Sequence, residues 1–337
     1  MNRRSFSLGI PGAAWFSPGA AAQQGAPAHP IRPAESFRDA LLETNPALSR
    51  FNPLRHILFF DDFDNGHNGW CELQANHNGN LDDLRPALRD MRPPQISSCS
   101  FFDIGTHGSM DGTYALKIAT RPKPFHTATG IKRMTFGKPG PVQFEMWFTF
   151  KPEQTFDPER QWDGNVSPSQ MDFGDFTISN DLCGGDGGPR YMCALRYWNT
   201  DLDDKLAEKW SYKTSLHTTT KMDRAGQRAP SQTMDYQVQD IHDWADVPGG
   251  HQPLCFNELA TKINWHYLRW AFDTRERRNT LLQVNDMMLD LRTVPVLTYP
   301  QPYRAESHLM NFVLDVRTHK PVRNFLFVDS ALVSFGE

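Results

Sequence analysis

Three segments of this 337-residue chain place an aromatic side chain two residues away from a charged one. The pairs are Glu145 with Trp147, Arg196 with Trp198, and Tyr267 with Arg269. On a β-strand, residues two apart point to the same side of the sheet. A carboxylate beside an aromatic ring could act as a general acid or base on a sugar that stacks against the ring. Three such strands predict a sugar-binding groove, and ordinary cross-strand pairs on a solvated face are the alternative.

Asp172 and Asp175 are a second source of acidic groups. Glycosidases use two carboxylates, roughly 5 Å apart for retention and about 6.5–9.5 Å apart for inversion. With Glu145, these two residues are the candidate catalytic acids for hydrolysis, and the sequence leaves open which of them approach each other. Trp70 is a further aromatic candidate for sugar binding.

His266 and Tyr267 suit a different reaction, the β-elimination of a uronate-containing chain. An arginine such as Arg269 would neutralise the uronate carboxylate while histidine or tyrosine removes the α-proton. A lone histidine more often has a structural role, which is the alternative for His266. The chain has 12 histidines, but none in a His-Glu-x-x-His or other compact metal-binding spacing.

Several other functional classes lack support in the sequence. A Gly-x-Ser-x-Gly elbow, a phosphate-binding loop and a dinucleotide fingerprint are all absent. We therefore expect no nucleotide or redox cofactor. The net charge of −4 is spread along the chain and gives no basic face, which disfavours a nucleic-acid partner.

The elements that must position these residues are mostly strands. Residues 141–150 alternate most clearly, with five apolar side chains on one face, as a half-buried strand requires. Residues 201–210 predict a short helix with an acidic start. Residues 213–257 lack periodicity, which indicates a long loop that is either functional or disordered. Further strands are predicted at 57–60, 114–118, 171–179, 191–199, 263–273, 281–285, 308–317 and 325–334. The absence of βα alternation disfavours a doubly wound fold.

Four segments, in this order, resemble the concanavalin A-like lectin/glucanase superfamily. They are ILFFDDFDNGHNGW (57–70), DGTYALKI (111–118), NWHYLRWAFDTRERRNTLLQVND (264–286) and NFLFVDSALVSFGE (324–337). The resemblance implies an all-β jelly-roll sandwich of two antiparallel sheets, with a long inserted loop region, few short helices and a ligand in the concave groove. The glucanase Glu-x-Asp-x-x-Glu signature and the alginate-lyase-type Gln-Ile-His motif are both absent.

The same resemblance implies a structural Ca²⁺ between the first and last strands. Asp62, Asp111 and Asp329 are the acids in the corresponding segments. Ca²⁺ requires about six to eight oxygen ligands, which carboxylates and turn carbonyls can supply. The alternative is that these aspartates cap turns by accepting hydrogen bonds from backbone amides.

The N-terminal residues predict export. Residues 1–22 resemble a twin-arginine signal peptide, with Arg3 and Arg4 followed by small residues, and a basic tail on a cytoplasmic protein is the alternative. We assign residues 23–54 to a linker or N-terminal strap and residues 55–337 to the jelly-roll domain, insertion-rich over 150–262. No run approaches the ~18 apolar residues of a membrane span. Of the five cysteines, Cys183 and Cys193 flank a turn-rich segment that could bring them into a disulfide.

Together these features favour a periplasmic or secreted enzyme, a glycoside hydrolase or polysaccharide lyase, that acts on a poly- or oligosaccharide. Long loops on a rigid scaffold often build a catalytic pocket, which favours an enzyme. Two alternatives remain open: a non-catalytic glycan-binding protein and an interaction protein of the cell envelope. The fold alone does not decide among them.

Overall fold

The structure is a computed structural model in which the chain divides into two units, residues 1–35 and 36–337. All described residues belong to the second unit. They are 46–71, 95–98, 109–156, 165–166, 169–183, 190–215, 218–220, 234–236, 241–258, 263–298 and 309–336. In this part of the chain, no helix has the length and apolar character that crossing a bilayer requires.

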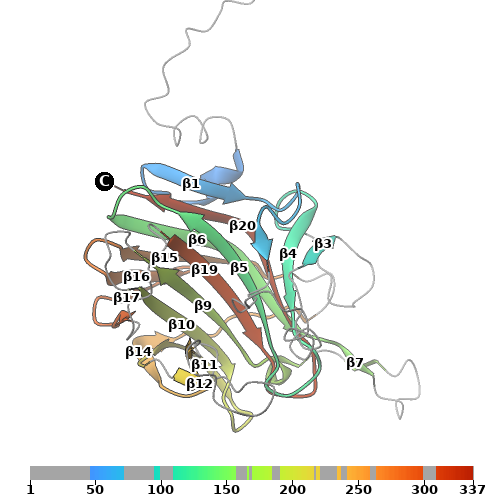
Figure 1. The fold of residues 1–337 in the computed structure, drawn as a ribbon. Coiled ribbons are helices and arrows are strands. Elements are labelled where there is room, and N and C mark those ends of the chain that lie inside the picture. The colour runs from blue at the N-terminus through green and yellow to red at the C-terminus, as the bar shows by residue number, and fades with distance from the viewer. Residues whose placement is uncertain are drawn as a thin grey trace, which may run out of the picture. The chain divides into compact units, whose positions relative to one another are not determined.

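Eight strands form one antiparallel sheet, here called sheet A (Figure 1). Its order is β17-β16-β15-β6-β20-β4-β3, and β1 also pairs with β20. The strands are β1 (His56–Asp61), β3 (Gln95–Ser98), β4 (Tyr114–Ala119), β6 (Pro141–Pro152), β15 (His266–Asp273), β16 (Arg278–Val284), β17 (Met287–Asp290) and β20 (Asn324–Phe335). Neighbouring strands are all antiparallel.

A second eight-stranded antiparallel sheet, sheet B, has the order β14-β11-β10-β9-β19-β5-β2, and β18 pairs with β10. Its strands are β2 (Trp70–Cys71), β5 (Thr127–Thr135), β9 (Asp175–Leu182), β10 (Tyr191–Thr200), β11 (Leu206–Lys213), β14 (Trp244–His251), β18 (Leu297–Thr298) and β19 (Leu309–Arg317). The remaining described elements are the strand pairs β7 (Thr155–Phe156) with β8 (Asn165–Val166) and β12 (Thr218–Thr220) with β13 (Met234–Tyr236), and the 3-10 helices η1 (Pro46–Arg50) and η2 (Gln170–Asp172).

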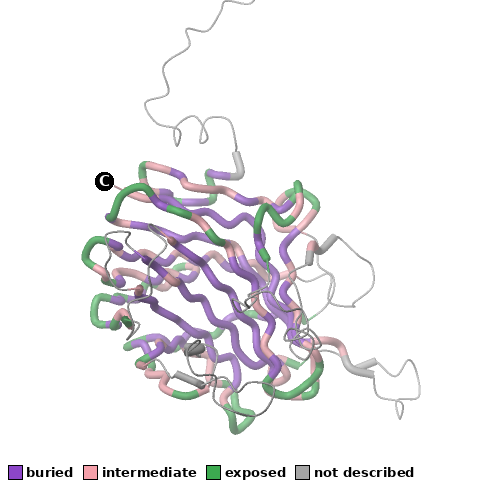
Figure 2. Tube along the Cα trace, in the orientation of Figure 1, coloured by how far each residue is buried: buried purple, intermediate pink, exposed green. Residues whose placement is uncertain are grey.

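One hydrophobic core lies between the two sheets. Phe144 of β6 in sheet A stacks on Phe312 of β19 in sheet B, with ring centres 4.6 Å apart. The inward positions of β6 and β15 alternate as the sequence predicts, since Leu268 and Trp270 are fully buried. Figure 2 shows the central strands of both sheets as almost continuously buried. The predicted all-β jelly-roll sandwich is confirmed.

The predicted helix at residues 201–210 is wrong. Asp201 instead closes a turn, because its Oδ1 accepts hydrogen bonds from the backbone N–H groups of Asp203 and Lys205. The chain then continues as β11, in which Trp210 is fully buried and pairs with Tyr197 of β10. The acidic residues that suggested a helix start therefore form a turn, and burial of Trp210 in the core stabilises the strand that follows.

Residues 150–262, read from the sequence as insertion-rich, contain four strands of sheet B: β9, β10, β11 and β14. The proposed disulfide does not form, since Cys183 and Cys193 are both buried free thiols. The register of β9 and β10 places Cys193 opposite Asn180 rather than Cys183. Its sulfur accepts a hydrogen bond from Asn279 Nδ2 at 3.0 Å.

Candidate functional site

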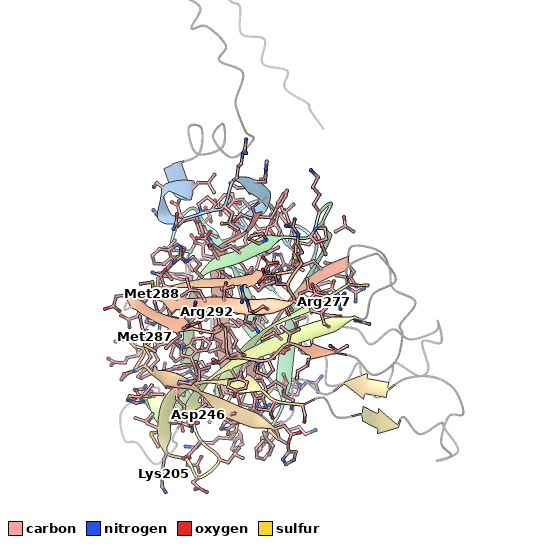
Figure 3. The ribbon with its side chains drawn as sticks, turned by 90° about the vertical axis from the view of Figure 1, so that its left-hand side faces the viewer. Lys205, Asp246, Arg277, Met287, Met288 and Arg292 are labelled. Carbon is pink, nitrogen blue, oxygen red and sulfur yellow. The ribbon has the colours of Figure 1, made fainter. Side chains whose placement is uncertain are left out.

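Polar side chains are in register across the outer face of sheet B, the side turned away from the core. Phe176, Leu195 and Leu314 point into the core, so the residues that alternate with them point outward. One row comprises Thr129, Asp315, Thr177, Arg196, Ser211 and Asp246, the last of which is labelled in Figure 3. The adjacent row comprises Thr127, Arg317, Asp175, Trp198 and Lys209.

Asp175 lies at the centre of this face and contacts two nitrogen-bearing side chains. Its Oδ1 is 3.3 Å from Arg196 Nε, and its Oδ2 is 2.8 Å from His319 Nε2. Burial by itself raises the pKa of a carboxyl group. Here the charge of Arg196, the hydrogen bond with His319 and the charge of Arg317 outweigh burial and hold the pKa of Asp175 below its usual range. Asp175 is therefore ionised at neutral pH.

Arg196 lies between two tryptophan rings. Its guanidinium carbon is 4.0 Å from the ring centre of Trp244 and 4.9 Å from that of Trp198. Its Nε also donates a hydrogen bond to Thr177 Oγ1 at 2.9 Å. Cation–π contacts of this kind are strongest where the cation is removed from water, and the Arg196 side chain is 1% exposed. The guanidinium group is thus fixed in position by three neighbours.

Four residues of this face were not predicted from the sequence: Asp315, Arg317, His319 and Trp244. Asp315 accepts a hydrogen bond from Thr129 Oγ1, directly across the β19–β5 pair. The alternation within 308–317 could have identified Asp315 and Arg317 as outward-facing. His319 follows the end of β19, where periodicity gives no signal, and Trp244 lies in the stretch that lacked periodicity.

Gly174 allows the backbone to come close to this cluster. A Cβ at Gly174 would lie 2.6 Å from the carbonyl oxygen of Arg317 and 2.9 Å from His319 Cδ2. Non-bonded atoms do not approach so closely, so any larger residue at position 174 would push away either the Arg317 backbone or the His319 ring. Glycine at this position therefore leaves room for His319 to reach the side chain of Asp175, the next residue in the chain.

The Glu145 segment lies on the outer face of sheet A. Glu145 is fully buried, and its Oε1 accepts hydrogen bonds from the backbone N–H of Asn52 at 2.7 Å and from the Tyr267 hydroxyl. Trp147 and Tyr267 are register partners with ring centres 5.4 Å apart. Arg269 is the register partner of Glu145. These four side chains therefore form one cluster.

The structure does not bring the three predicted pairs together in one groove. Glu145, Trp147, Tyr267 and Arg269 are on the outer face of sheet A, while Arg196 and Trp198 are on the outer face of sheet B. The core separates the two faces. Sequence alternation identified outward-facing positions, but it could not say to which sheet each strand belongs.

His266 and Tyr267 point to opposite faces of β15, so they cannot act together on one ligand. His266 Nε2 is 2.8 Å from the Cys255 carbonyl oxygen, and its ring packs against Phe148 at 5.4 Å. Burial lowers the pKa of His266, although its hydrogen bond to the Cys255 carbonyl acts in the opposite direction. A neutral histidine that faces the core has a structural role.

Trp70 and Asp172 also lie apart from the Asp175 cluster. Trp70 is a core residue, 3% exposed, and its Nε1 donates a hydrogen bond to Asp61 Oδ2 at 2.8 Å. It does not offer a sugar-stacking surface. Asp172 is the last residue of η2 and is partly exposed, with its Oδ1 3.3 Å from Lys320 Nζ.

The three aspartates expected to hold Ca²⁺ do not share a site. Asp329 Oδ2 accepts hydrogen bonds from the backbone N–H groups of Met110 and Asp111, and Asp62 Oδ1 accepts one from Asp64. The Asp111 carboxylate is 3.4 Å from Arg50. No group of three acidic, histidine or cysteine side chains in the described ranges could hold a metal. Asp62 and Asp329 therefore match the turn-capping alternative, Asp111 pairs with Arg50 instead, and the three side chains do not fit a shared Ca²⁺ site.

A lysine pairs with Asp61, the residue that precedes Asp62 in the chain. Lys132 Nζ is 2.9 Å from Asp61 Oδ2 and also contacts the Asn68 carbonyl oxygen. Asp61 ends β1 of sheet A, whereas Lys132 belongs to β5 of sheet B. This ion pair therefore connects the two sheets.

Several solved structures are similar to this chain at low identity. A β-1,3-glucanase from Mycobacterium marinum is 12% identical, with 82% of this chain and 98% of that chain covered and a TM-score of 0.34. A legume lectin-like domain from Entamoeba histolytica is 8% identical, with 74% and 92% covered and a TM-score of 0.33. Lectin UEA-II complexed with galactose is 7% identical, with 72% and 93% covered and a TM-score of 0.31.

A search of curated protein sequences finds no match. One family model matches residues 38–337, nearly the whole chain. Its description is "Domain of unknown function (DUF6772)". The match extends from before the first described strand to the last residue, so it includes both sheets and both polar faces. This chain belongs to the DUF6772 family.

Proposed function

We propose that this chain binds a carbohydrate at the outer face of sheet B. The observation that carries the proposal is the guanidinium group of Arg196, held between Trp198 and Trp244 beside the ionised Asp175. Ligand sites commonly combine aromatic side chains with a few convergent polar groups that fix orientation. A sugar matches this combination, since it has apolar C–H faces and hydroxyl groups at its edges.

The energetic cost of this face supports a functional role. A buried charge is unfavourable unless it is paired, and replacing a buried ion pair by apolar residues is often neutral or stabilising. Sheet B nevertheless keeps the charges of Asp175, Arg196 and Arg317 buried on one face, with the carboxyl group of Asp315 on the same face. Clusters of charges with shifted pKa values are concentrated at functional sites.

The margin of the face is less buried than its centre. Trp244 is half-buried, and the ion pair of Asp181 with Arg190, at one end of the β9–β10 pair, is partly exposed. Asp181 is in register with Asn311 of β19. We infer that a ligand meets the face first at this margin, and that Arg196 and Asp175 contact its buried part.

Hydrolysis is the chemistry that these acids favour. Arg317 is opposite Asp175 and Thr177 is opposite Asp315, so the two aspartates are diagonal neighbours on adjacent strands. The backbones of such neighbours are roughly 7–8 Å apart, a spacing that allows their carboxyl groups the ~6.5–9.5 Å separation of inverting glycosidases. Asp175, kept ionised, would take a proton from the attacking water. Asp315 would give its proton to the leaving oxygen as the glycosidic bond breaks.

Elimination is a second candidate, favoured by the hydrogen bond of Asp175 with His319. A carboxylate that orients a histidine is a common arrangement for a general base. His319 would then remove the α-proton of a uronate, the bond to the glycosidic oxygen would break as a new C=C bond forms, and the leaving oxygen would take a proton from water. Arg317 or Arg196 would stabilise the developing negative charge on the uronate.

The test is a screen of the purified protein against neutral and uronate-containing glycans. Reducing ends and the absorbance of unsaturated uronate are followed together, and binding is measured by affinity electrophoresis. New reducing ends that are lost in both Asp175→Asn and Asp315→Asn indicate hydrolysis, whereas absorbance lost in His319→Ala indicates elimination. Binding without turnover indicates a lectin.

Asp290→Asn is the matched control, because Asp290 is an exposed residue of β17 in the other sheet and is paired with Arg292. Arg292 is labelled in Figure 3. The Asp290→Asn variant should keep the binding and turnover of the native protein. The proposal fails if Arg196→Met leaves all glycan binding unchanged, or if no glycan of the panel binds.

A further inference from the structure

Four buried polar atoms on the outer face of sheet A have no hydrogen-bond partner in the described structure. They are Glu145 Oε2, Trp147 Nε1, Thr149 Oγ1 and Arg269 Nε. Native proteins leave few such atoms unsatisfied, because each one loses its bonds to water without replacement. A group of four on one face therefore requires a partner that is not a residue of this cluster.

The four side chains are neighbours on adjacent strands. Glu145, Trp147 and Thr149 occupy successive outward positions of β6, and Arg269 of β15 is the register partner of Glu145. Directly opposite residues such as Glu145 and Arg269 are about 4.5–5.5 Å apart, and successive outward positions of one strand are roughly 7 Å apart, so the row from Glu145 to Thr149 spans roughly 13–14 Å. A ligand that contacts all four atoms must therefore carry hydrogen-bonding groups along this length, as a sugar with hydroxyl groups at its edges does.

Residues 48–54 form the last part of the segment assigned above to a linker or N-terminal strap, and they cover this face. From here on, the strap means residues 48–54 only. Leu48 and Phe51 pack in the same hydrophobic cluster as Trp147 and Tyr267. The strap is also held by two hydrogen bonds of Asn52, whose N–H donates to Glu145 Oε1 at 2.7 Å and whose carbonyl accepts from Gln143 Nε2 at 2.6 Å. These contacts fix one oxygen of Glu145 and leave the other without a partner.

We propose that the outer face of sheet A holds a second ligand site, under the strap, for a monosaccharide or a similar polyol. The unsatisfied atoms include the N–H donors of Trp147 and Arg269, the Glu145 carboxylate oxygen as acceptor, and the Thr149 hydroxyl, which can be either. An anionic ligand would be repelled by the Glu145 carboxylate, and a cationic ligand would be repelled by the Arg269 guanidinium group. Neutral hydroxyl groups, which both donate and accept, match the mixed set.

The aromatic rings support the same ligand. Trp147 and Tyr267 are only partly buried, and their ring centres are 5.4 Å apart. An aromatic face beside hydrogen-bonding groups suits the apolar face of a pyranose ring. This site is on the opposite sheet from the Asp175 cluster, so the inference does not depend on the function proposed for sheet B.

The test measures binding of single sugars by saturation-transfer difference NMR. The probes are neutral aldohexoses and N-acetylhexosamines at millimolar concentration, applied to the whole protein. Trp147→Phe removes one N–H donor and keeps an aromatic ring, and Thr149→Val removes one hydroxyl at nearly constant volume. We expect the signal of at least one sugar to fall several-fold in both variants and to persist in Asp290→Asn, which changes an exposed residue of the same sheet.

Stability of the free protein provides the second readout. The Thr149 hydroxyl has no partner to lose, so Thr149→Val should change the free energy of unfolding by less than about 1 kcal/mol. A larger loss would mean that the hydroxyl is already satisfied, for example by bound water, and would contradict the proposal. It is also overturned if no sugar gives a signal, or if the signal is equal in the native protein and both variants.

Discussion

Asp175 and Arg196 form an ion pair that is almost closed to solvent, with Oδ1 of Asp175 3.3 Å from Nε of Arg196 and side-chain exposures of 2% and 1%. Asp175→Asn would keep the volume and leave the Arg196 charge buried without its counter-ion. We expect the free energy of unfolding to fall by about 3–5 kcal/mol in a urea titration.

The matched control is Lys209→Met in the same sheet. It breaks the pair of Lys209 with Asp246, whose side chains are 39% and 60% exposed. Exposed pairs contribute little, so we expect a change of at most about 1 kcal/mol. Similar losses in the two variants would contradict the role given to the buried pair.

Asp329 should make stability depend on pH between about 4 and 6. Burial raises the pKa of Asp329 from 3.8 to about 6, although hydrogen bonds from Asp111, Met110 and Ser330 act to lower it. The folded state therefore retains a proton that the unfolded state has lost. This contribution is fully present below about pH 4 and is lost as the pH rises through 6.

Asp329→Asn cannot ionise, and its amide oxygen can still accept the same backbone hydrogen bonds. Relative to the native protein, the variant should gain stability by up to about 3 kcal/mol between pH 4 and 7. Denaturation curves at several pH values measure this difference. A difference that does not change with pH would show that Asp329 titrates normally.

Gly174→Ala should disturb the Asp175 cluster without changing any charge. The new Cβ would overlap the Arg317 carbonyl oxygen and the His319 ring. Overpacking of this kind typically costs about 1–3 kcal/mol, and we also expect weaker glycan binding at sheet B. In the control Gly137→Ala, a Cβ meets nothing within 4 Å, so stability should stay the same or rise by up to about 1 kcal/mol.

Chelation of Ca²⁺ should leave the melting temperature unchanged, because the aspartates of this region are satisfied within the protein. Lys132→Met should instead lower stability by roughly 3 kcal/mol, since Asp61 would remain buried without its cation. Lys138→Met, at an exposed position of the loop that follows β5, is the control and should have little effect. A large drop in melting temperature with chelator would show that a metal stabilises the fold.

The cysteines should differ in their reaction with iodoacetamide. Burial raises the pKa of the Cys193 thiol to about 12, although a hydrogen bond from Asn279 acts to lower it, so Cys193 should remain unmodified in the native protein at pH 8. Cys183 is also buried, whereas Cys71 and Cys255 are exposed and should react. Mass spectrometry before and after unfolding checks this, and a Cys183–Cys193 peptide pair under non-reducing conditions would contradict it.

Short-range patterns in the sequence determined much of the fold. The alternation at 141–150 and 263–273 fixed both the strands and their inward faces, because a strand buried on one side needs a period of two. The pattern failed at 201–210, where charges that suggested a helix start instead cap a turn before the buried Trp210. There, a long-range packing requirement overrode the local preference.

The candidate sites depended on tertiary structure. The sequence identified Arg196 and Glu145 as outward-facing, since alternation is a local property of each strand, and it named Asp175 only as a candidate acid. Only the pairing of distant strands placed Arg196 beside Asp175 and His319, and put Glu145 on the opposite sheet under the strap. Strand order is set by how all the inward faces pack into one core, and that choice cannot be read from any single strand.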